Sequence, residues 1–455
     1  MKMMISSEVE ITDYDGVFAD WCESNLYVDN PEYNKKLRMG FWVGNTPKRI
    51  ALYHKNGDKI YIPRGLADEV VKVFPQECLK VDFNDDKKFG LFETSIIPLY
   101  DYQKRAVDVM QGKSIGILQS AAGSGKTQMA LALICRKGYK ALWLTHTKDL
   151  LEQSYKRAAQ YMPKEWLGKI TGGKVDIGKG ITFATVQTMC KLDPEIYKNE
   201  FNTVIVDECH RVSGTPAKVT QFSKILNNIN ARYKYGISAT VHRSDGLIRC
   251  TEVLLGSVKY IVPDDAVIEK IMPVKVVKRK TDTPSSDEYL DGAGMISYTH
   301  LIEYLIKCRE RQNMIAGDIN KNSDRYCLVL SDRISQLEEL RRMVKSHRTA
   351  LITGKTAQKS RNEAIEKMKK GEINVLFATY NLAKEGLDIP YLDRLFLTTP
   401  HKDYAVTVQA VGRIARIAEG KVDAVCYDYV DENIGYCKRA YMQRCRHYKK
   451  ARCIL

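Results

Sequence analysis

The chain has 455 residues, too many for one hydrophobic core, so two or three domains are expected. Its 44% hydrophobic and 28% charged residues are typical of a globular protein, and no apolar run reaches the length that spans a membrane. The net charge of +16 indicates a polyanionic partner, but charge alone does not separate a nucleic acid from a membrane surface.

The N-terminus and the cysteines both favour a cytosolic protein. We expect no secretion signal, because acidic residues interrupt the start of the chain: Glu8, Glu10, Asp13 and Asp15. None of the 12 cysteines belongs to a C-x-x-C pair. They are therefore expected to be reduced thiols, not zinc ligands or disulfides.

Residues 1–95 are predicted to form a small accessory domain of mixed α and β structure. The runs 49–55 and 59–63 flank Asn56-Gly57-Asp58, which predicts a hairpin because Asn-Gly supplies the positive φ angles of a tight turn. This segment holds 13 Lys or Arg against 16 Asp or Glu, whereas the rest of the chain holds 58 against 39. The sequence leaves two roles open for it, packing against the next domain or binding DNA.

From residue 96 onward the pattern changes to buried strands that alternate with helices, which is typical of α/β domains with parallel sheets. We expect two such domains, 96–265 and 266–455. In the first, a helix over 127–136 stops at Gly138, and the strands are 114–119, 140–145, 180–185, 203–206 and 235–238. In the second, 281–294 is a surface loop, and the strands are 274–278, 326–330, 350–352, 374–378, 394–397 and 424–427.

The segment 120–127 reads Ser-Ala-Ala-Gly-Ser-Gly-Lys-Thr and lies between a predicted strand and a predicted helix. Its glycines let backbone N–H groups approach phosphate oxygens, at the positive end of the helix. The lysine is expected to reach the β- and γ-phosphates of ATP, and the threonine hydroxyl to ligate Mg²⁺. The predicted nucleotide-binding residues are Ser120, Gly123, Ser124, Gly125, Lys126 and Thr127.

Asp207 and Glu208 follow the apolar strand 203–206. At the end of a buried strand, adjacent carboxylates can divide the work of hydrolysis. We expect Asp207 to hold hydrated magnesium, and Glu208 to orient and deprotonate the attacking water.

A second pattern of charged residues occurs in the last domain, where Gln409 and Gly412 precede Arg413 and Arg416. The two arginines are three positions apart, so they are expected to project from one helix face. Arg416 is the preferred candidate to stabilise charge on the phosphoryl group in transfer. The pattern predicts that ATP is bound between the two α/β domains.

The chain resembles the superfamily 2 helicases, because their motifs occur in order over residues 99–416. The resemblance implies two tandem RecA-like domains. Gln103 is assigned to adenine, although Leu99-Tyr100-Asp101 departs from the usual Leu-Arg-Pro, and Gly386 and Asp388 are assigned to ATP. His210, Ser238 and Thr240 are assigned to coupling hydrolysis with movement. The implied nucleic-acid contacts are His146, Thr147, Thr185, Gln187, Ser331, Arg333 and Thr379.

Arg243, Asp245 and Gly246 form an Arg-x-Asp-Gly extension that resembles the XPB branch of the superfamily, and within it the tailed-phage UvsW-type helicases. This resemblance implies an ATP- and Mg²⁺-dependent enzyme that unwinds branched DNA, migrates Holliday junctions and reverses forks in recombination, repair or replication. It also implies a monomer in the cytosol of a bacterium or phage-infected host, with recombination or single-strand-binding proteins as further partners.

Short polar residues in these motifs suit contacts to phosphates, and no aromatic stacking platform is evident from the sequence. DNA binding is therefore expected to be indifferent to sequence and to weaken steeply with salt. The basic residues after Glu432 fit either a solvated helix face or a polyanion contact. Three alternatives stay open for the whole chain: an RNA helicase, a translocase on double-stranded DNA that does not separate strands, and a catalytically silent DNA-binding scaffold.

Overall fold

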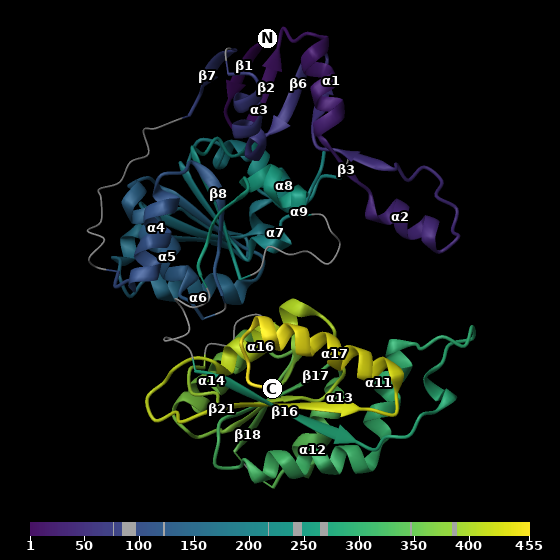
Figure 1. Cartoon of the computed structure of the whole chain (residues 1–455). Coiled ribbons are helices and arrows are strands. Elements are labelled where there is room, and N and C mark those ends of the chain that lie inside the picture. Colours follow the sequence, from purple (N-terminus) through teal and green to yellow (C-terminus); the bar gives the residue numbers. More distant parts are fainter. Residues whose placement is uncertain are drawn as a thin grey trace. The chain divides into compact units, whose positions relative to one another are not determined.

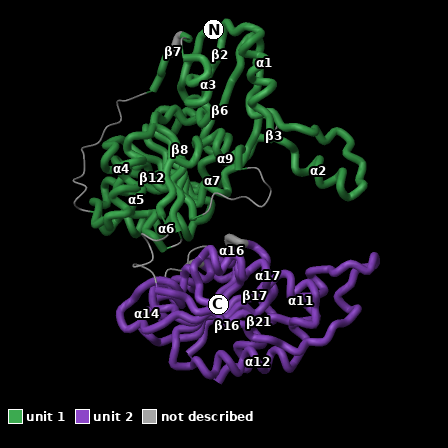
Figure 2. Tube along the Cα trace, viewed as in Figure 1, with its two compact units in different colours: residues 1–266 green, residues 267–455 purple. Residues whose placement is uncertain are grey.

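The computed structural model describes residues 1–75, 77–83, 97–121, 123–216, 218–239, 248–263, 272–345, 348–384 and 389–455. The chain divides into two compact units, Met1–Ala266 (unit 1) and Val267–Leu455 (unit 2), which Figure 2 colours separately. Unit 1 contains both the N-terminal module and the first α/β domain. Among the described residues, no helix is both long enough and apolar enough to cross a lipid bilayer.

The N-terminal module is built on a five-stranded sheet with the order β5-β6-β2-β1-β7. The predicted Asn-Gly hairpin is confirmed between β5 and β6, with Gly57 at φ 61°. The run 49–55 does not form one strand, however, because 49–51 pairs with the distant strand β3. The strands are β1 (Lys2–Ile5), β2 (Glu8–Thr12), β3 (Tyr27–Asp29), β4 (Arg49–Ala51), β5 (His54–Asn56), β6 (Lys59–Pro63) and β7 (Cys78–Val81), and the helices are α1 (Gly16–Asn25), α2 (Pro31–Arg38), η1 (Arg64–Leu66) and α3 (Ala67–Val73).

The first α/β domain has an eight-stranded sheet with the order β11-β10-β12-β9-β13-β14-β8-β15, in which only β11 is antiparallel. All five predicted strands are present: β8 (Ile115–Gln119), β9 (Ala141–Thr145), β12 (Ile181–Thr185), β13 (Thr203–Asp207) and β14 (Tyr233–Ser238). Three further strands were not predicted. They are β10 (Leu167–Thr171), β11 (Lys174–Asp176) and β15 (Val258–Ile261), which lie toward the two edges of the sheet.

The helices of this domain connect the strands and cover the sheet (Figure 1). The helix that follows the phosphate loop, α5 (Lys126–Lys137), ends at Gly138, which adopts φ 67° and donates its N–H to the Ile134 carbonyl. A glycine in this left-handed conformation terminates a helix without steric cost. The other helices are α4 (Asp101–Gln111), α6 (Lys148–Ala158), η3 (Lys164–Trp166), α7 (Val186–Met189), η4 (Pro194–Ile196), η5 (Cys209–Arg211), α8 (Gln221–Asn228) and α9 (Ile248–Leu255).

Unit 2 has a six-stranded, all-parallel sheet with the order β16-β21-β20-β17-β19-β18. Its strands are β16 (Val274–Thr281), β17 (Cys327–Ser331), β18 (Thr349–Ile352), β19 (Val375–Thr379), β20 (Arg394–Leu397) and β21 (Ala424–Asp431). The helices are η6 (Asp287–Tyr289), α11 (Tyr298–Lys307), α12 (Arg309–Lys321), α13 (Ile334–Met343), α14 (Gln358–Lys369), α15 (Tyr380–Lys384), α16 (Tyr404–Ile414) and α17 (Gly435–Lys450). The two parallel sheets confirm the predicted tandem α/β fold.

Two apolar cores cover the two faces of the unit 2 sheet. One joins the strands to α12 and α13, and the other joins them to α14, α16 and α17. The basic C-terminal segment is therefore largely the helix α17, and it packs on the domain. Within it, Arg444 is buried and bidentate to Asp428, so this residue serves the core. Other basic residues of the segment are exposed: Lys438, Arg439, Arg446, Lys449, Lys450 and Arg452.

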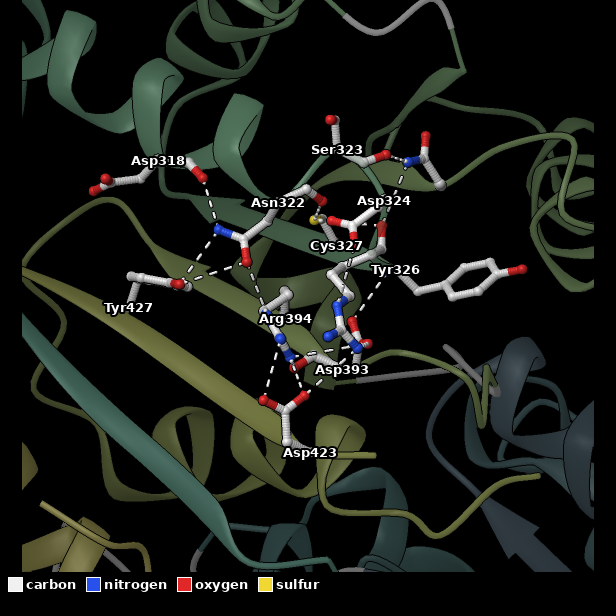
Figure 3. Close-up of polar contacts among 12 residues, drawn as sticks. Asp318, Asn322, Ser323, Asp324, Tyr326, Cys327, Asp393, Arg394, Asp423 and Tyr427 are labelled. Atoms are coloured by element: carbon white, nitrogen blue, oxygen red, sulfur yellow. Dashed lines mark hydrogen bonds and ion pairs between the residues drawn. The ribbon is translucent and has the colours of Figure 1, made fainter. Parts of the chain in front are cut away.

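A polar network fastens the amino-terminal edge of the unit 2 sheet (Figure 3). Arg394, at the start of β20, donates from Nε to Asn322 Oδ1 at 2.9 Å and from Nη1 to Asp423 Oδ1 at 2.8 Å. Asn322 in turn donates to the Asp318 carbonyl at the end of α12. The network ties the beginning of two strands to a helix, at the edge of the sheet opposite Ser331 and Thr379.

Candidate active site

The predicted phosphate loop and the predicted carboxylates meet at one edge of the unit 1 sheet. Strand β14 lies between β8, which leads into the loop, and β13, which ends at Asp207. The Ser120 N–H donates to the Ser238 carbonyl at 3.0 Å. Parallel neighbouring strands end at the same edge, so segments far apart in sequence share one site.

The loop has the backbone shape of a phosphate cradle. Gly123 and Gly125 adopt φ 82° and 80°, values that favour glycine. A Cβ at Gly125 would lie 2.3 Å from Gln103 Nε2, whereas one at Gly123 would meet nothing within 4 Å. The loop is thus tight where it rests on the protein and open at Gly123, and α5 begins directly after it. These residues fit a phosphate group, because helix N-termini offer unpaired N–H donors.

Lys126 is held at this loop, with Nζ 3.3 Å from the Ser120 carbonyl oxygen and 3.2 Å from that of Ala121. Ser120 also donates its hydroxyl to Ser124 Oγ at 2.5 Å, so the serine that replaces the usual first glycine braces the loop. Thr127 follows in the first turn of α5.

Gln103, predicted to read adenine, is buried and bonded to the main chain at both ends of its amide. Its Nε2 donates to the Ser124 carbonyl at 2.8 Å, and its Oε1 accepts from the Tyr100 N–H at 2.9 Å. Tyr102 donates its hydroxyl to the same Ser124 carbonyl at 3.0 Å. The structure therefore shows Gln103 supporting the phosphate loop, and its contact with adenine stays a prediction.

Burial and charge affect the two carboxylates in opposite ways. Burial, with the neighbouring Glu208 carboxylate, raises the pKa of Asp207, and Lys126 only partly opposes the rise. Burial also disfavours ionisation of Glu208, but the hydrogen bond from His210 and the charge of Lys126 outweigh it and lower the pKa of Glu208. Glu208 is thus set as the ionised base. Asp207 is a buried carboxyl whose ionised form a cation would stabilise, which fits a magnesium ligand.

His210 connects the base to the next strand. Its Nδ1 lies 3.2 Å from Glu208 Oε2 and 2.9 Å from Ser238 Oγ, and Glu208 itself adopts φ 50°. The three residues assigned to hydrolysis and coupling are therefore in contact. Thr240, the remaining coupling residue, lies outside the described residues, as do Arg243, Asp245, Gly246, Gly386 and Asp388.

The nucleic-acid residues predicted in unit 1 lie at the ends of two neighbouring strands, β9 and β12. Gln187 donates from Nε2 to the His146 carbonyl at 2.7 Å, which joins the two segments. Thr147 caps α6 by accepting from the Leu150 N–H, and Thr185 donates its hydroxyl to Thr188 Oγ1 at 3.0 Å. The structure brings these four predicted residues together.

In unit 2, Ser331 and Thr379 are paired in register at the carboxyl ends of β17 and β19. Ser331 is fully buried, donates its hydroxyl to Gln336 Oε1 at 2.6 Å and accepts from the Arg333 N–H at 3.0 Å. The structure thus shows Ser331 fixing the backbone of Arg333, and a direct contact with a strand stays a prediction for both.

The prediction that Arg413 and Arg416 project from one helix face is wrong, because α16 ends at Ile414. Lys421 donates from Nζ to the carbonyls of Ile414 and Arg416, at 2.6 and 2.8 Å. This contact ends the helix and holds the segment that carries Arg416. In the sequence, the glycine at position 420 signals a turn after this segment, and in the structure it adopts φ 75°.

Gln409 lies on α16 with its Oε1 buried and without a hydrogen-bond partner among the described residues. A buried polar atom without a partner is unusual and commonly marks a functional position. Gln409 also belongs to the sequence pattern that predicts ATP binding between the two domains.

Two family models match the chain. The model of the type III restriction enzyme res subunit matches residues 96–243, and that of the helicase conserved C-terminal domain matches residues 305–418. The first spans the phosphate loop and both carboxylates, and the second spans Gln409 and both arginines. The first matched region lies in the first α/β domain, and the second lies in unit 2.

The chain is a superfamily 2 helicase of the DExH type.

Relatives of this helicase carry names from both nucleic-acid classes. The DNA 3′–5′ translocase XPB2 of Sulfurisphaera tokodaii is 24% identical over 391 residues, covering 76% of this chain and 85% of the relative. A mimivirus protein named as an ATP-dependent RNA helicase is 26% identical over 352 residues, and the match covers 74% of this chain but only 64% of that relative. The predicted relation to the XPB branch is confirmed.

One solved structure supports the fold. Saccharomyces cerevisiae Dbp5, bound to RNA and ADP BeF3, aligns with 80% of the helicase and 93% of its own chain, at 14% identity and a TM-score of 0.58. This likeness confirms the predicted RecA-like domains. T4 UvsW aligns with 100% of the helicase and 98% of its own chain, at 19% identity and a TM-score of 0.41.

Proposed function

We propose that this helicase is a DNA-dependent ATPase that unwinds and remodels branched DNA, by fork reversal or branch migration. The observation that carries the ATPase is the contact of His210 with both Glu208 and Ser238, beside the loop that holds Lys126. It links the hydrolytic base to the strand that precedes the coupling segment. The choice of DNA is supported by the named activity of XPB2 and by the net charge of +16.

The residues of unit 1 have separable tasks in this proposal. The glycine loop, Lys126 and Thr127 bind the phosphates of ATP, and Asp207 with Thr127 holds Mg²⁺, which neutralises charge on the transferred group. Glu208 removes the proton from the attacking water, for which it must be ionised, and its lowered pKa keeps it so. Ser238 and His210 relay the change at Glu208 to the end of β14.

We also assign Gln409, Arg413 and Arg416 of unit 2 to hydrolysis, because they form the Gln-x-x-Gly-Arg-x-x-Arg pattern within the matched helicase C-terminal domain. An arginine that stabilises the transferring phosphoryl group contributes on the order of 10³–10⁵ in rate. Arg416→Ala is therefore expected to abolish DNA-stimulated hydrolysis while ATP binding persists.

The deciding experiment compares ATP hydrolysis with single-stranded DNA, duplex, forks, four-way junctions and RNA of matched length. Forks and junctions are expected to stimulate hydrolysis most, and Lys126→Ala is the inactive control. Stimulation by RNA above that by every DNA would refute the assignment to DNA and favour the RNA helicase that the mimivirus relative's name suggests.

XPB2 is named a DNA 3′–5′ translocase, so a second candidate function is translocation along DNA without strand separation. A strand-displacement assay beside a triplex-displacement assay separates the two. If triplexes are displaced and forks are not unwound, the chain moves along duplexes without separating strands.

A further inference from the structure

Residues 27–51 form an arm that extends from the N-terminal module of unit 1, as Figure 1 shows for β3 and α2. Its base is the antiparallel pair of β3 and β4. Asn30 fixes the next position, because its N–H donates to the Lys48 carbonyl at 3.0 Å and its Nδ2 donates to the Pro47 carbonyl at 2.8 Å. Asn30 also caps α2 by accepting from the Glu32 N–H. The arm is thus a built element with a defined stem.

The outer part of the arm exposes aromatic rings. Trp42 is 87% exposed and Phe41 is 60% exposed, and Leu37 and Met39 beside them are exposed as well. The Trp42 ring lies against Gly44, where an added Cβ would come within 2.8 Å of the ring. Large apolar side chains gathered at one exposed place usually mark a binding surface. Here glycine supports one side of the indole, and most of the ring is open to solvent.

The charge of the arm differs from that of the module that carries it. Residues 30–49 hold five basic side chains and one acidic side chain, whereas the rest of residues 1–95 holds eight basic and fifteen acidic. Lys35, Arg38, Lys48 and Arg49 are exposed. A basic, aromatic arm on an acidic module is complementary to a nucleic acid, which offers negative phosphates and bases that stack on aromatic rings. A basic or purely apolar protein surface would not match the positive charge of the arm.

The module that carries the arm is packed firmly on the ATPase domain. A Cβ at Gly65 would lie 2.2 Å from the Glu252 carbonyl oxygen on α9, and Arg249 of the same helix pairs with Glu69 at 2.5 Å. Helix α9 follows the segment assigned to coupling. Both sheets also contribute to a single apolar core. Helix α9 is therefore in direct contact with the module that carries the arm.

We propose that the arm is the element that engages DNA where single and double strands meet, with Trp42 stacked on an unpaired base and Lys35, Arg38 and Lys48 on the phosphates. This inference rests on the proposed action on DNA and names the element that contacts the junction. Aromatic stacking is tolerant of sequence because every base has a π face, so the arm suits a helicase that does not read sequence.

The direct test is the fluorescence of Trp42 in the full chain, titrated with a synthetic fork that has single-stranded tails. The fork is expected to quench the wild type, and Trp42→Phe is expected to lose that quenching while it keeps binding, because phenylalanine still stacks. A blunt duplex of the same length is expected to quench less. Equal quenching in the wild type and in Trp42→Phe would overturn the proposal, since the signal would come from other tryptophans.

The functional test uses Trp42→Ala, with Val17→Ala as the control, since Val17 is 68% exposed on α1 of the same module. Trp42→Ala is expected to weaken fork binding roughly 5- to 140-fold, the value of one stacked base, and to lower unwinding in proportion. ATP hydrolysis at saturating DNA should not change, because the arm has no part in the phosphate site. Unchanged fork binding and unwinding in Trp42→Ala would overturn the proposal.

Two further outcomes have separate meanings. In one outcome, the fork does not quench Trp42 and Trp42→Ala binds forks like the wild type, but the variant no longer binds a single-strand-binding protein. The arm then docks a protein, and the proposal is wrong. If no nucleic acid stimulates hydrolysis by the wild type, the proposed function fails, while quenching by the fork still reports on the arm. A Lys35→Ala, Arg38→Ala, Lys48→Ala variant is expected to reduce the slope of log affinity against log salt by about 2 to 3.

Discussion

Glu208 is held in a backbone conformation that glutamate rarely adopts, with φ 50° and ψ 50°. Such conformations cost of order 1–3 kcal/mol and persist only where the surrounding structure enforces them. Here the ring of His210 and the hydroxyl of Ser238 surround the carboxylate. This strained backbone conformation fits a residue whose side chain is oriented toward a reacting water, at a cost in stability.

The role of this carboxylate can be tested by Glu208→Gln, which keeps the shape of the side chain and removes its basicity. The rate of ATP hydrolysis is expected to fall about 10²- to 10⁴-fold, the usual contribution of a general base. Binding of ATP and of DNA should persist, as measured by equilibrium titration. Hydrolysis within a few-fold of the wild type would show that another group takes the proton.

His210→Ala is expected to change the pH dependence of hydrolysis. The hydrogen bond and charge of His210 lower the pKa of Glu208, so their removal should raise that pKa toward or above its ordinary value. Since the base must be ionised, the acidic limb of the pH–rate profile should move to higher pH. A profile of unchanged shape, with only a lower plateau, would mean that His210 acts on coupling alone.

At the scale of the element, the polar network of Figure 3 shows how unit 2 holds its strands at the edge opposite Ser331 and Thr379. Arg394 is almost fully buried and bonds to Asn322 and to Asp423, which is about half exposed. The network leaves the opposite edge free for Ser331 and Thr379, whereas Lys421 lies close to Arg394 and Asp423 of the network itself.

Arg394→Met should lower the free energy of unfolding of unit 2 by about 2–3 kcal/mol, because it removes charge-assisted hydrogen bonds and leaves Asn322 Oδ1 with only the long contact from the Tyr427 hydroxyl. Urea unfolding would measure the change. The matched control is Lys369→Met, whose exposed pair with Glu366 on α14 should contribute no more than about 0.5 kcal/mol. Similar losses in both variants would show that the buried network has no special weight.

Local patterns predicted the central strands well, because buried parallel strands are short apolar runs. The strand 394–397 was predicted with its observed bounds, and the glycines of the phosphate loop have the required φ angles. Contacts between distant residues could not be predicted. The end of α16 depends on Lys421, the burial of Ser331 depends on Gln336, and the arm depends on pairing of 27–29 with 49–51. None of these leaves a periodic signal in the sequence.

At the scale of the whole molecule, the sequence predicted a separate N-terminal module, and the structure gives it a sheet of its own but a core shared with the ATPase domain. At Gly65 the backbone of the module lies directly against α9 of that domain. Gly65→Ala would place a methyl group 2.2 Å from the Glu252 carbonyl oxygen and 2.5 Å from that of Val253, both of them backbone atoms that cannot rotate away.

Gly65→Ala is therefore expected to displace α9 from the module and to destabilise unit 1 by about 1–3 kcal/mol, the usual cost of overpacking. Unwinding should fall more than hydrolysis, because the path from the coupling segment to the arm is loosened. Thermal unfolding together with both activities would measure this. Gly16→Ala, at a site with nothing within 4 Å, is the control. Equal behaviour of the two variants would show that the docking is not needed.

The side chain of Lys234 has a consequence for how the N-terminal module can be studied. Its Nζ reaches from β14 to the Ser7 carbonyl at 3.1 Å and to the Leu226 carbonyl at 2.7 Å, and burial lowers its pKa to about 7. A shortened protein that begins after residue 95 would uncover this amine together with the apolar surface around it. Such a truncated protein would be prone to aggregate. A loss of its activity would therefore not show whether the removed residues bind DNA. Point substitutions in the arm leave the interface around Lys234 intact. They are therefore the informative way to separate DNA binding by the arm from ATP hydrolysis by the α/β domains.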